Sequence, residues 1–158
     1  MLFTILFTAA LVAIDQITKM LATMYLAPVG VMPFIPGVMQ LQYVLNDGAA
    51  FSILSGNRYF LIGVTGIALL ALAIYLFVKK PQSRLEHLAW VLVLAGGLGN
   101  LIDRILNGVV VDFFAVTFMN FAVFNVADCF VCIGVGLLFL FFILEEVKAK
   151  KEKPHADI

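Results

Sequence analysis

The sequence predicts a mainly α-helical, polytopic membrane protein with four transmembrane helices and a small extracytoplasmic β element between helices 1 and 2. Hydrophobic residues make up 63% of the 158 residues and charged residues only 13%, whereas soluble domains are about 45–50% apolar. The mean hydropathy is +1.09. The net charge is zero and no basic face is evident, which argues against a nucleic-acid partner. We expect residues 1–158 to form a single membrane domain.

Four apolar stretches are long enough to cross a bilayer, because a helix rises about 1.5 Å per residue and the hydrocarbon core is about 30 Å thick. The second stretch contains no charged residue, and the fourth ends at Leu144, where acidic and basic residues return the chain to water. The predicted spans cover residues 2–24, 59–78, 88–106 and 125–144.

The distribution of basic residues predicts the orientation of these spans. Most of the Lys and Arg residues lie between the second and third spans or after the fourth, and such segments are usually cytoplasmic. We therefore expect both termini to be cytoplasmic, with the first span retained because it lacks the basic leader of a cleaved signal peptide. The cytoplasmic segments would be a turn at 79–86 and a tail at 145–158, and the outer segments 25–57 and 107–123.

The first outer segment begins with turn-forming residues and continues with a short alternating stretch. Residues 38–44, with the sequence Val-Met-Gln-Leu-Gln-Tyr-Val, alternate in the manner of a half-buried strand. The preceding turn residues are Pro28, Pro33, Pro36 and Gly37. This pattern predicts the small β element.

Polar residues in three of the spans lie at a similar depth. Counted inward from the cytoplasmic ends, they lie about 20–26 Å along their helices, near the outer face. These residues are Asp15, Asn100, Asp103 and Asp128. Asp112 approaches the same level from the second outer segment. Intramembrane charges cost about 2.5–3.5 kcal/mol each at a helix centre, so this coincidence predicts one polar site.

Two of these carboxylates have candidate partners nearby. Asp15 and Lys19 are four residues apart and share a helix face, and Asp103 can pair with Arg104 or with a neighbouring helix. We interpret both as bracing pairs that can also touch a polar ligand. Two others, Asp112 and Asp128, have no basic residue within four positions.

Two unpaired aspartates in a water-poor site are suited to acid–base hydrolysis. Two neighbouring carboxylates do not both ionise cheaply, so one holds a proton while the other accepts a proton from water. This chemistry requires neither a metal nor a cofactor, and both histidines lie on the predicted cytoplasmic side. A competing dyad of Asp103 with Asp128 is less suitable, because Arg104 and Asn100 would hold Asp103 as a structural anion.

Small residues around the predicted site have two possible roles. The glycines between Gly96 and Gly99 would let either another helix or a substrate backbone approach closely. The sequence does not distinguish a role in helix packing from a role in substrate contact. Asn125 lies three residues before Asp128, which would put both on one helix face. The Cys129 and Cys132 pair matches a CxxC motif, but in an apolar helix we expect packing and no disulfide.

Five short blocks in order resemble one known family, the lipoprotein signal peptidases (signal peptidase II). The resemblance extends from residue 15 to residue 128 and covers nearly the whole chain in topology. The blocks are Asp15-Gln16-Ile17-Thr18-Lys19, Asn46-Asp47-Gly48-Ala49-Ala50-Phe51, Gly96-Gly97-Leu98-Gly99-Asn100-Leu101-Ile102-Asp103-Arg104, Val110-Val111-Asp112-Phe113 and Phe124-Asn125-Val126-Ala127-Asp128.

The resemblance implies an aspartic intramembrane endopeptidase of the bacterial inner membrane, with its active site near the outer face. Such an enzyme removes the signal peptide from diacylglyceryl-modified prolipoproteins just before the lipidated cysteine. Asp112 and Asp128 match the catalytic dyad. The substrate-binding or supporting positions would be Asn46, Asn100, Arg104, Asn125, Asp15, Lys19, Gly96 and Asp103. Asp47 should be dispensable. We expect the enzyme to contact membrane lipid and to function as a monomer.

A proton-coupled small membrane transporter is the alternative function, since it would also place carboxylates inside a small bundle. Transporters often contain internal repeats and pairs of broken helices, and neither is evident in this sequence. A structural membrane subunit would not need an unpaired pair of aspartates.

Overall fold

The computed structural model describes residues 1–48, 53–79, 81 and 83–152. Within these residues, four helices are long and apolar enough to cross a membrane, as predicted. They are α1 (Leu2–Leu21, continued by the π-helical turn η1, Ala22–Leu26), α2 (Arg58–Ile74, continued by η3, Tyr75–Lys79), α3 (Arg84–Leu106) and α4 (Val126–Glu152). Parts of the predicted segments lie outside the described residues, namely residues 49–52, 80, 82 and 153–158.

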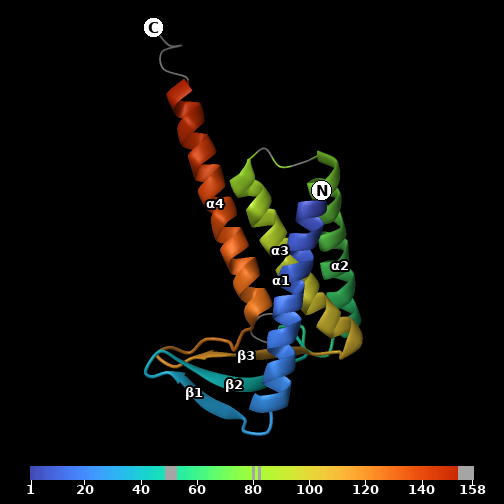
Figure 1. The fold of residues 1–158 in the computed structure, drawn as a ribbon, viewed down its shortest axis with the longest axis vertical. Coiled ribbons are helices and arrows are strands. Elements are labelled where there is room, and N and C mark those ends of the chain that lie inside the picture. The colour runs from blue at the N-terminus through green and yellow to red at the C-terminus, as the bar shows by residue number, and fades with distance from the viewer. Residues whose placement is uncertain (49–52, 80, 82, 153–158) are drawn as a thin grey trace.

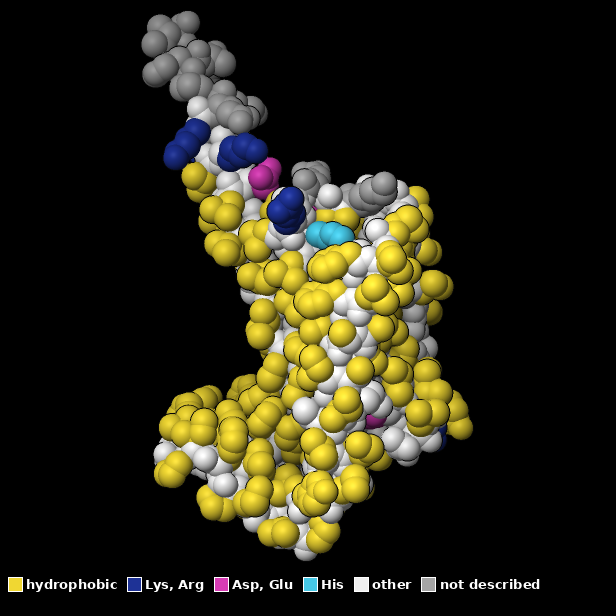
Figure 2. All heavy atoms as spheres, viewed as in Figure 1, with side chains coloured by type: hydrophobic (Ala, Val, Ile, Leu, Met, Phe, Trp, Pro, Cys, Tyr) yellow, Lys and Arg dark blue, Asp and Glu magenta, His cyan; other side chains and the backbone are white. Residues whose placement is uncertain are grey.

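The helices form a bundle with a small sheet at one end (Figure 1). The N-terminus and the last turn of α4 lie at the opposite end of the bundle, and the sheet projects sideways below the start of α4. Helix α3 contacts α1, α2 and α4. Figure 2 shows hydrophobic side chains over most of the visible face of the bundle and the sheet, while Lys and Arg side chains gather toward the far end of α4. Such a surface is suited to hydrocarbon along the bundle and to water at that end.

The predicted β element is confirmed, and it is larger than the sequence indicated. Strands β1 (Val31–Ile35) and β2 (Met39–Asn46) form an antiparallel pair, and β2 also pairs with β3 (Val110–Val116). The third strand comes from the second outer segment, where no strand was expected. The first four residues of β3 are all buried, and those around Asp112 are apolar. The strand therefore lacks the alternation of apolar and polar residues that marks a half-buried strand in a sequence.

Two helix ends differ from the predicted spans for identifiable reasons. Helix α3 begins at Arg84, because the Oγ of Ser83 accepts a hydrogen bond from the main-chain N–H of Glu86 at 3.1 Å and caps the helix. Helix α4 continues to Glu152 through part of the expected tail. An i,i+4 ion pair between Lys150 and Glu146, at 2.7 Å, supports this extension.

The glycines of α3 let the neighbouring helices approach. A Cβ atom added at Gly96 would collide with the main-chain oxygen of Ala127 and would lie 2.8 Å from Cγ2 of Val131. A Cβ atom at Gly99 would collide with the carboxylate of Asp15. Of the two readings left open above, helix packing is therefore the one that the geometry favours for both glycines.

Replacing Gly96 with Ala is expected to destabilise the protein by about 1–3 kcal/mol, the usual cost of overpacking. The clash involves main chain of α4, which cannot rotate away, so α3 and α4 must separate. Thermal unfolding in detergent would measure the loss. Gly136→Ala is the matched control, because a Cβ atom there has nothing within 4 Å. Equal melting temperatures for the two variants would contradict this account of the interface.

Candidate active site

Asp112 lies in the middle of β3, opposite Val44 of β2, and is only 2% exposed. Both of its carboxylate oxygens accept hydrogen bonds from amide groups. The Nδ2 of Asn46, at the end of β2, donates to Oδ2 at 2.9 Å. The Nδ2 of Asn125, just before α4, donates to Oδ1 at 2.6 Å. The sheet therefore carries Asp112 to the start of α4.

Asp128 lies in the first turn of α4, where it forms a capping box with Asn125. The Oδ1 of Asn125 accepts from the N–H of Asp128 at 3.0 Å, and Oδ2 of Asp128 accepts from the N–H of Asn125 at 3.0 Å. The other oxygen of Asp128 accepts from Nδ2 of Asn100, on α3, at 2.8 Å. Each oxygen of this carboxylate thus has a fixed donor.

Asn125 connects the two carboxyl groups and is completely buried. Its main chain and its side-chain oxygen hold Asp128, while its Nδ2 reaches both Asp112 and Oδ1 of Asn100, the latter at 3.1 Å. The expectation that Asn125 shares a helix face with Asp128 was wrong in detail. Helix α4 begins at Val126, so Asn125 is the capping residue before the helix.

Lys19 is the centre of a buried charged cluster behind Asn100. Its Nζ lies 2.9 Å from Oδ2 of Asp15 and 3.0 Å from Oδ2 of Asp103, and it donates to Oδ1 of Asn100 at 2.8 Å. The predicted pairing of Asp15 with Lys19 is confirmed. The sequence left Asp103 two possible partners, Arg104 and a residue of a neighbouring helix. The structure shows the second, because Asp103 pairs with Lys19 of α1. This ion pair engages Oδ2 of Asp103 with the ammonium group of Lys19.

Asp15 also supports the first turn of α4. Its Oδ1 accepts from the main-chain N–H of Ala127 at 3.0 Å. This N–H is one of those that a helix start leaves without an intrahelical partner. A carboxylate there also interacts favourably with the helix dipole. Through this contact, a residue of α1 helps to place Asp128.

Two supporting residues were not recognised in the sequence. Gln16 donates from Nε2 to Asp15, to the main-chain oxygen of Gly99 and to Asp103, at 3.1, 3.2 and 3.1 Å. Arg58 donates to the main-chain oxygens of Arg104 and Ile105, at 2.8 and 2.7 Å, and so caps the end of α3. Gln16 stands in one of the five family-like blocks, and this position was the sequence signal that could have identified it. For Arg58, the only sequence signal was its position next to the start of a predicted span.

Arg104 lies beside the carboxyl groups and holds the segment that follows β2. Its NH2 group donates to the main-chain oxygen of Gly48 at 2.7 Å, and NH1 to that of Asn100 at 3.4 Å. Its Nε has no hydrogen-bond partner among the described residues. Arg104 also lines the pocket described below, and a guanidinium carries five N–H donors, so it is suited to binding a carbonyl oxygen there.

The two carboxyl groups face a pocket of about 440 Å³. It lies where the sheet, α3 and the start of α4 meet. Its lining combines polar side chains with apolar side chains and two free thiols. The lining residues are Asn46, Asn100, Arg104, Val110, Asp112, Phe121, Ala122, Val123, Phe124, Asp128, Cys129, Val131 and Cys132. Within the described part of the chain, no group of three or more His, Cys, Asp and Glu side chains could hold a metal ion.

The pKa of Asp112 is raised to about 6, and burial is the largest cause. The negative charge of Asp128 contributes to the rise, while the hydrogen bonds from Asn46 and Asn125 and the charge of Lys19 act in the opposite direction. Burial dominates because removing a carboxylate from water disfavours its charged form. Asp112 can therefore carry a proton at a pH where an ordinary aspartate cannot.

Comparison with solved structures identifies the class of protein that this fold and site define. A bacterial membrane enzyme determined by the in meso method at 2.3 Å resolution superposes with a TM-score of 0.80 at 33% identity, covering 99% of this chain and 94% of the other. A second bacterial membrane enzyme, at 1.9 Å resolution, gives a TM-score of 0.79 at 34% identity, covering 89% and 92% of the two chains. The fold is that of a multi-pass bacterial membrane enzyme.

The particular family follows from sequence comparison. The family model described as signal peptidase (SPase) II matches residues 7–144. The lipoprotein signal peptidase of Streptococcus pyogenes serotype M2 (strain MGAS10270) is 41% identical over 137 residues, which cover 86% of this chain and 90% of that protein. The serotype M1 protein is 40% identical over the same lengths. The chain belongs to the signal peptidase II family.

Proposed function

We propose that this chain is an aspartic endopeptidase that cleaves the signal peptide from diacylglyceryl-modified prolipoproteins, just before the lipidated cysteine. Family membership supports a peptidase that acts on lipoprotein signal peptides, and it does not favour the transporter alternative. The observation that carries the aspartic mechanism is Asn125, whose amide and main chain hold Asp112 and Asp128 at one pocket.

The proposed mechanism uses one proton shared by the two aspartates. The ionised carboxylate takes a proton from water as the water oxygen attacks the scissile carbonyl carbon. The neutral carboxyl donates its proton to the carbonyl oxygen, which gives a tetrahedral intermediate. The C–N bond then breaks, the nitrogen of the lipidated cysteine receives a proton from the dyad, and the signal peptide leaves with a free carboxylate.

The remaining pocket residues are assigned binding and supporting roles. We assign the substrate backbone to Arg104 and to the amides of Asn46 and Asn100, which all line the pocket. Asp15, Lys19 and Asp103 keep α1, α3 and α4 in place through the buried cluster. Gly96 supports the site by allowing α4 to approach α3.

The proposed orientation places both termini in the cytoplasm and the pocket near the outer face. The basic residues at the far end of α4 support this arrangement, because cytoplasmic segments are rich in Lys and Arg. The pocket lies at the other end of the bundle, beside the sheet (Figure 1). We further propose that the chain forms a single membrane domain that works as a monomer.

The test is cleavage of a synthetic lipoprotein precursor by the purified protein in detergent. A peptide carrying a diacylglyceryl-modified cysteine should be cut once, on the amino side of that cysteine. Mass spectrometry of both products would locate the bond. Intact precursor after prolonged incubation, with the lipid confirmed in place, would refute the proposal.

The pH dependence of the same assay tests the shared proton. Asp112, with a pKa of about 6, holds its proton below that pH and loses it above. Once both carboxyls are ionised, no acid remains to protonate the carbonyl oxygen. We therefore expect kcat/KM to fall as the pH rises through about 6. A flat profile across this range would argue against Asp112 as the proton donor.

A further inference from the structure

The pocket is lined in part by apolar side chains and thiols that the proposed chemistry does not use. The polar lining residues are Asn46, Asn100, Arg104, Asp112 and Asp128. The other lining residues are Val110, Phe121, Ala122, Val123, Phe124, Cys129, Val131 and Cys132. The proposed chemistry and the binding of a peptide backbone use the polar residues, so the others are available to apolar parts of the substrate.

Helix α4 carries the pocket wall from the carboxyl groups toward the interior of the membrane. Asp128 lies in its first turn, and Cys132 follows four residues later, about 6 Å further along the axis. Cys129 is partly buried, whereas Cys132 is exposed. The wall therefore begins at a catalytic group and ends at a side chain on the outer surface of the helix, where hydrocarbon replaces water.

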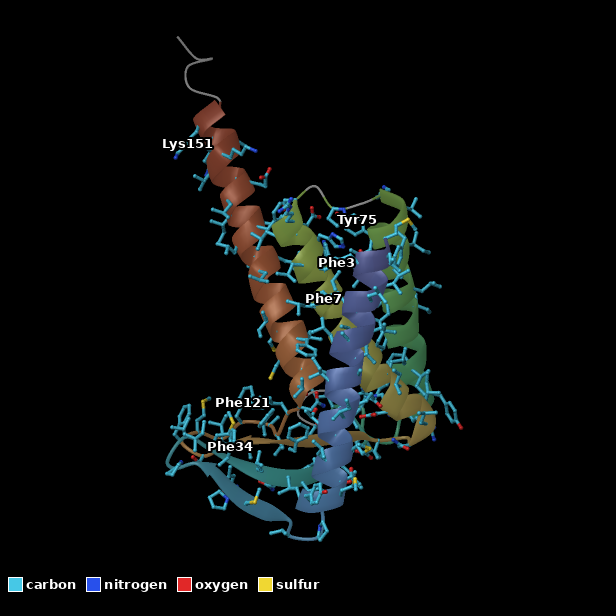
Figure 3. All side chains as sticks on the ribbon, in the orientation of Figure 1. Phe3, Phe7, Phe34, Tyr75, Phe121 and Lys151 are labelled. Atoms are coloured by element: carbon cyan, nitrogen blue, oxygen red, sulfur yellow. The ribbon has the colours of Figure 1, made fainter. Side chains whose placement is uncertain are left out.

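The opposite wall is fixed by the sheet. Phe124 exchanges main-chain hydrogen bonds with Phe114 of β3: its oxygen accepts at 2.8 Å and its N–H donates at 3.0 Å. Its ring lies 6.0 Å from that of Phe121. Figure 3 shows Phe121 in the angle between the sheet and the start of α4, and in Figure 2 the visible face is hollowed between the sheet and α4. These two aromatic side chains and the two small thiol side chains therefore line the same pocket.

We propose that the passage between Phe121 and the thiol-bearing face of α4 receives the thioether-linked lipid of the substrate, which makes Cys132 a specificity-determining residue. The inference rests on the proposed function, because the scissile bond then adjoins the lipidated cysteine and its glyceryl group starts beside the dyad. The lipid must leave through an uncharged opening toward hydrocarbon. Small side chains at positions 129 and 132 keep that opening wide enough for a branched glyceryl group.

Kinetics with a side chain that narrows the passage provide the first test. Cys132→Phe is expected to lower kcat/KM for a diacylglyceryl-modified precursor peptide by about tenfold or more, a typical effect of misfit in an apolar pocket. The matched control is Ile133→Phe, at nearly the same depth on α4 but exposed and outside the pocket lining. Equal kinetics for Cys132→Phe and Ile133→Phe would overturn the proposal.

Thiol protection provides a test that does not depend on turnover. The chain has two cysteines, so Cys129→Ala leaves Cys132 as its only thiol. Adding Asp112→Asn prevents consumption of the ligand. In this double variant, the lipidated precursor peptide should slow alkylation of Cys132 by N-ethylmaleimide. The same peptide with Ser in place of the lipidated cysteine, which brings no thiol of its own, should leave the rate unchanged.

The outcomes separate this inference from the proposed function. Equal protection by the two peptides would mean that peptide, and not lipid, occupies the passage. Absence of protection by the lipidated peptide, with wild-type enzyme cleaving it in parallel, would overturn the lipid path and leave the peptidase standing. Failure of wild-type enzyme to cleave the lipidated peptide would instead refute the proposed function.

Discussion

Replacing Asp112 or Asp128 with Asn is expected to lower kcat for precursor cleavage by about 10³-fold or more, at the strong end of general acid–base effects. Either change removes one carboxyl from the proposed dyad, so the remaining aspartate cannot both accept and donate the proton. The double variant should be no slower than the single ones, because residues that act as a unit are not additive. Initial rates with the lipidated precursor, after thermal unfolding has confirmed a folded protein, provide the measurement.

The controls for this experiment are two other aspartates. Asp47→Asn should retain near wild-type kcat, because Asp47 is exposed and bonds only Ser55 among the contacts identified for its side chain. Asp103→Asn addresses the competing dyad, and its effect should come mainly through stability, since Asp103 is held by Lys19 and Gln16. Near-normal activity of Asp112→Asn together with an inactive but stable Asp103→Asn would reverse the assignment.

Replacing Lys19 with Met is expected to produce the largest loss of stability, about 3–5 kcal/mol, as found when one partner of a buried ion pair is removed. Its side chain is 4% exposed and forms ion pairs with both Asp15 and Asp103. Without it, two buried carboxylates remain close together with no cation between them. Met fills a similar volume, so the loss would measure charge more than packing. Thermal or denaturant unfolding in detergent would quantify it.

Two further variants check that the charge of Lys19 is the cause. Adding Asp103→Asn to Lys19→Met should recover part of the lost stability, because one of the stranded carboxylates is then neutral. Lys148→Met is the exposed control: its pair with Glu145 is 4.0 Å long and more than half of its side chain is exposed, so it should cost less than about 1 kcal/mol. A larger loss in the Lys19→Met and Asp103→Asn double variant than in Lys19→Met would contradict the charge account.

The depth of the polar residues was predictable because helix rise is constant. Counting along three spans put Asp15, Asn100, Asp103 and Asp128 in one layer, and hydrogen bonds and ion pairs now join them. The pairing of Asp15 with Lys19 was predictable for the same reason, since residues four apart share a helix face. The geometry of a single helix and the free-energy cost of burying an unpaired charge in the membrane were sufficient for these two inferences.

The remaining parts of the site depend on contacts between distant segments. Asp112 reaches its place through a strand that pairs with β2, and its uniformly apolar neighbours gave no alternating signal. The partner of Asp103 on α1 could not be chosen from sequence, because pairing across helices depends on their rotation. The capping role of Asn125 depended on where α4 begins, and helix ends are the least predictable part of a helix.

Helix α4 is the last of the four helices in chain order; it supplies Asp128, and Asn125 directly precedes it. Until it has entered the membrane, Asp112 lacks the amide of Asn125, and Asp15 lacks the N–H of Ala127. The proposed dyad is therefore incomplete for almost the whole of synthesis, which proceeds from the N-terminus. A protease assembled in this order is inactive as a nascent chain. Its own earlier helices, and other proteins that insert beside it, are therefore not exposed to a complete active site until its last helix is in the membrane.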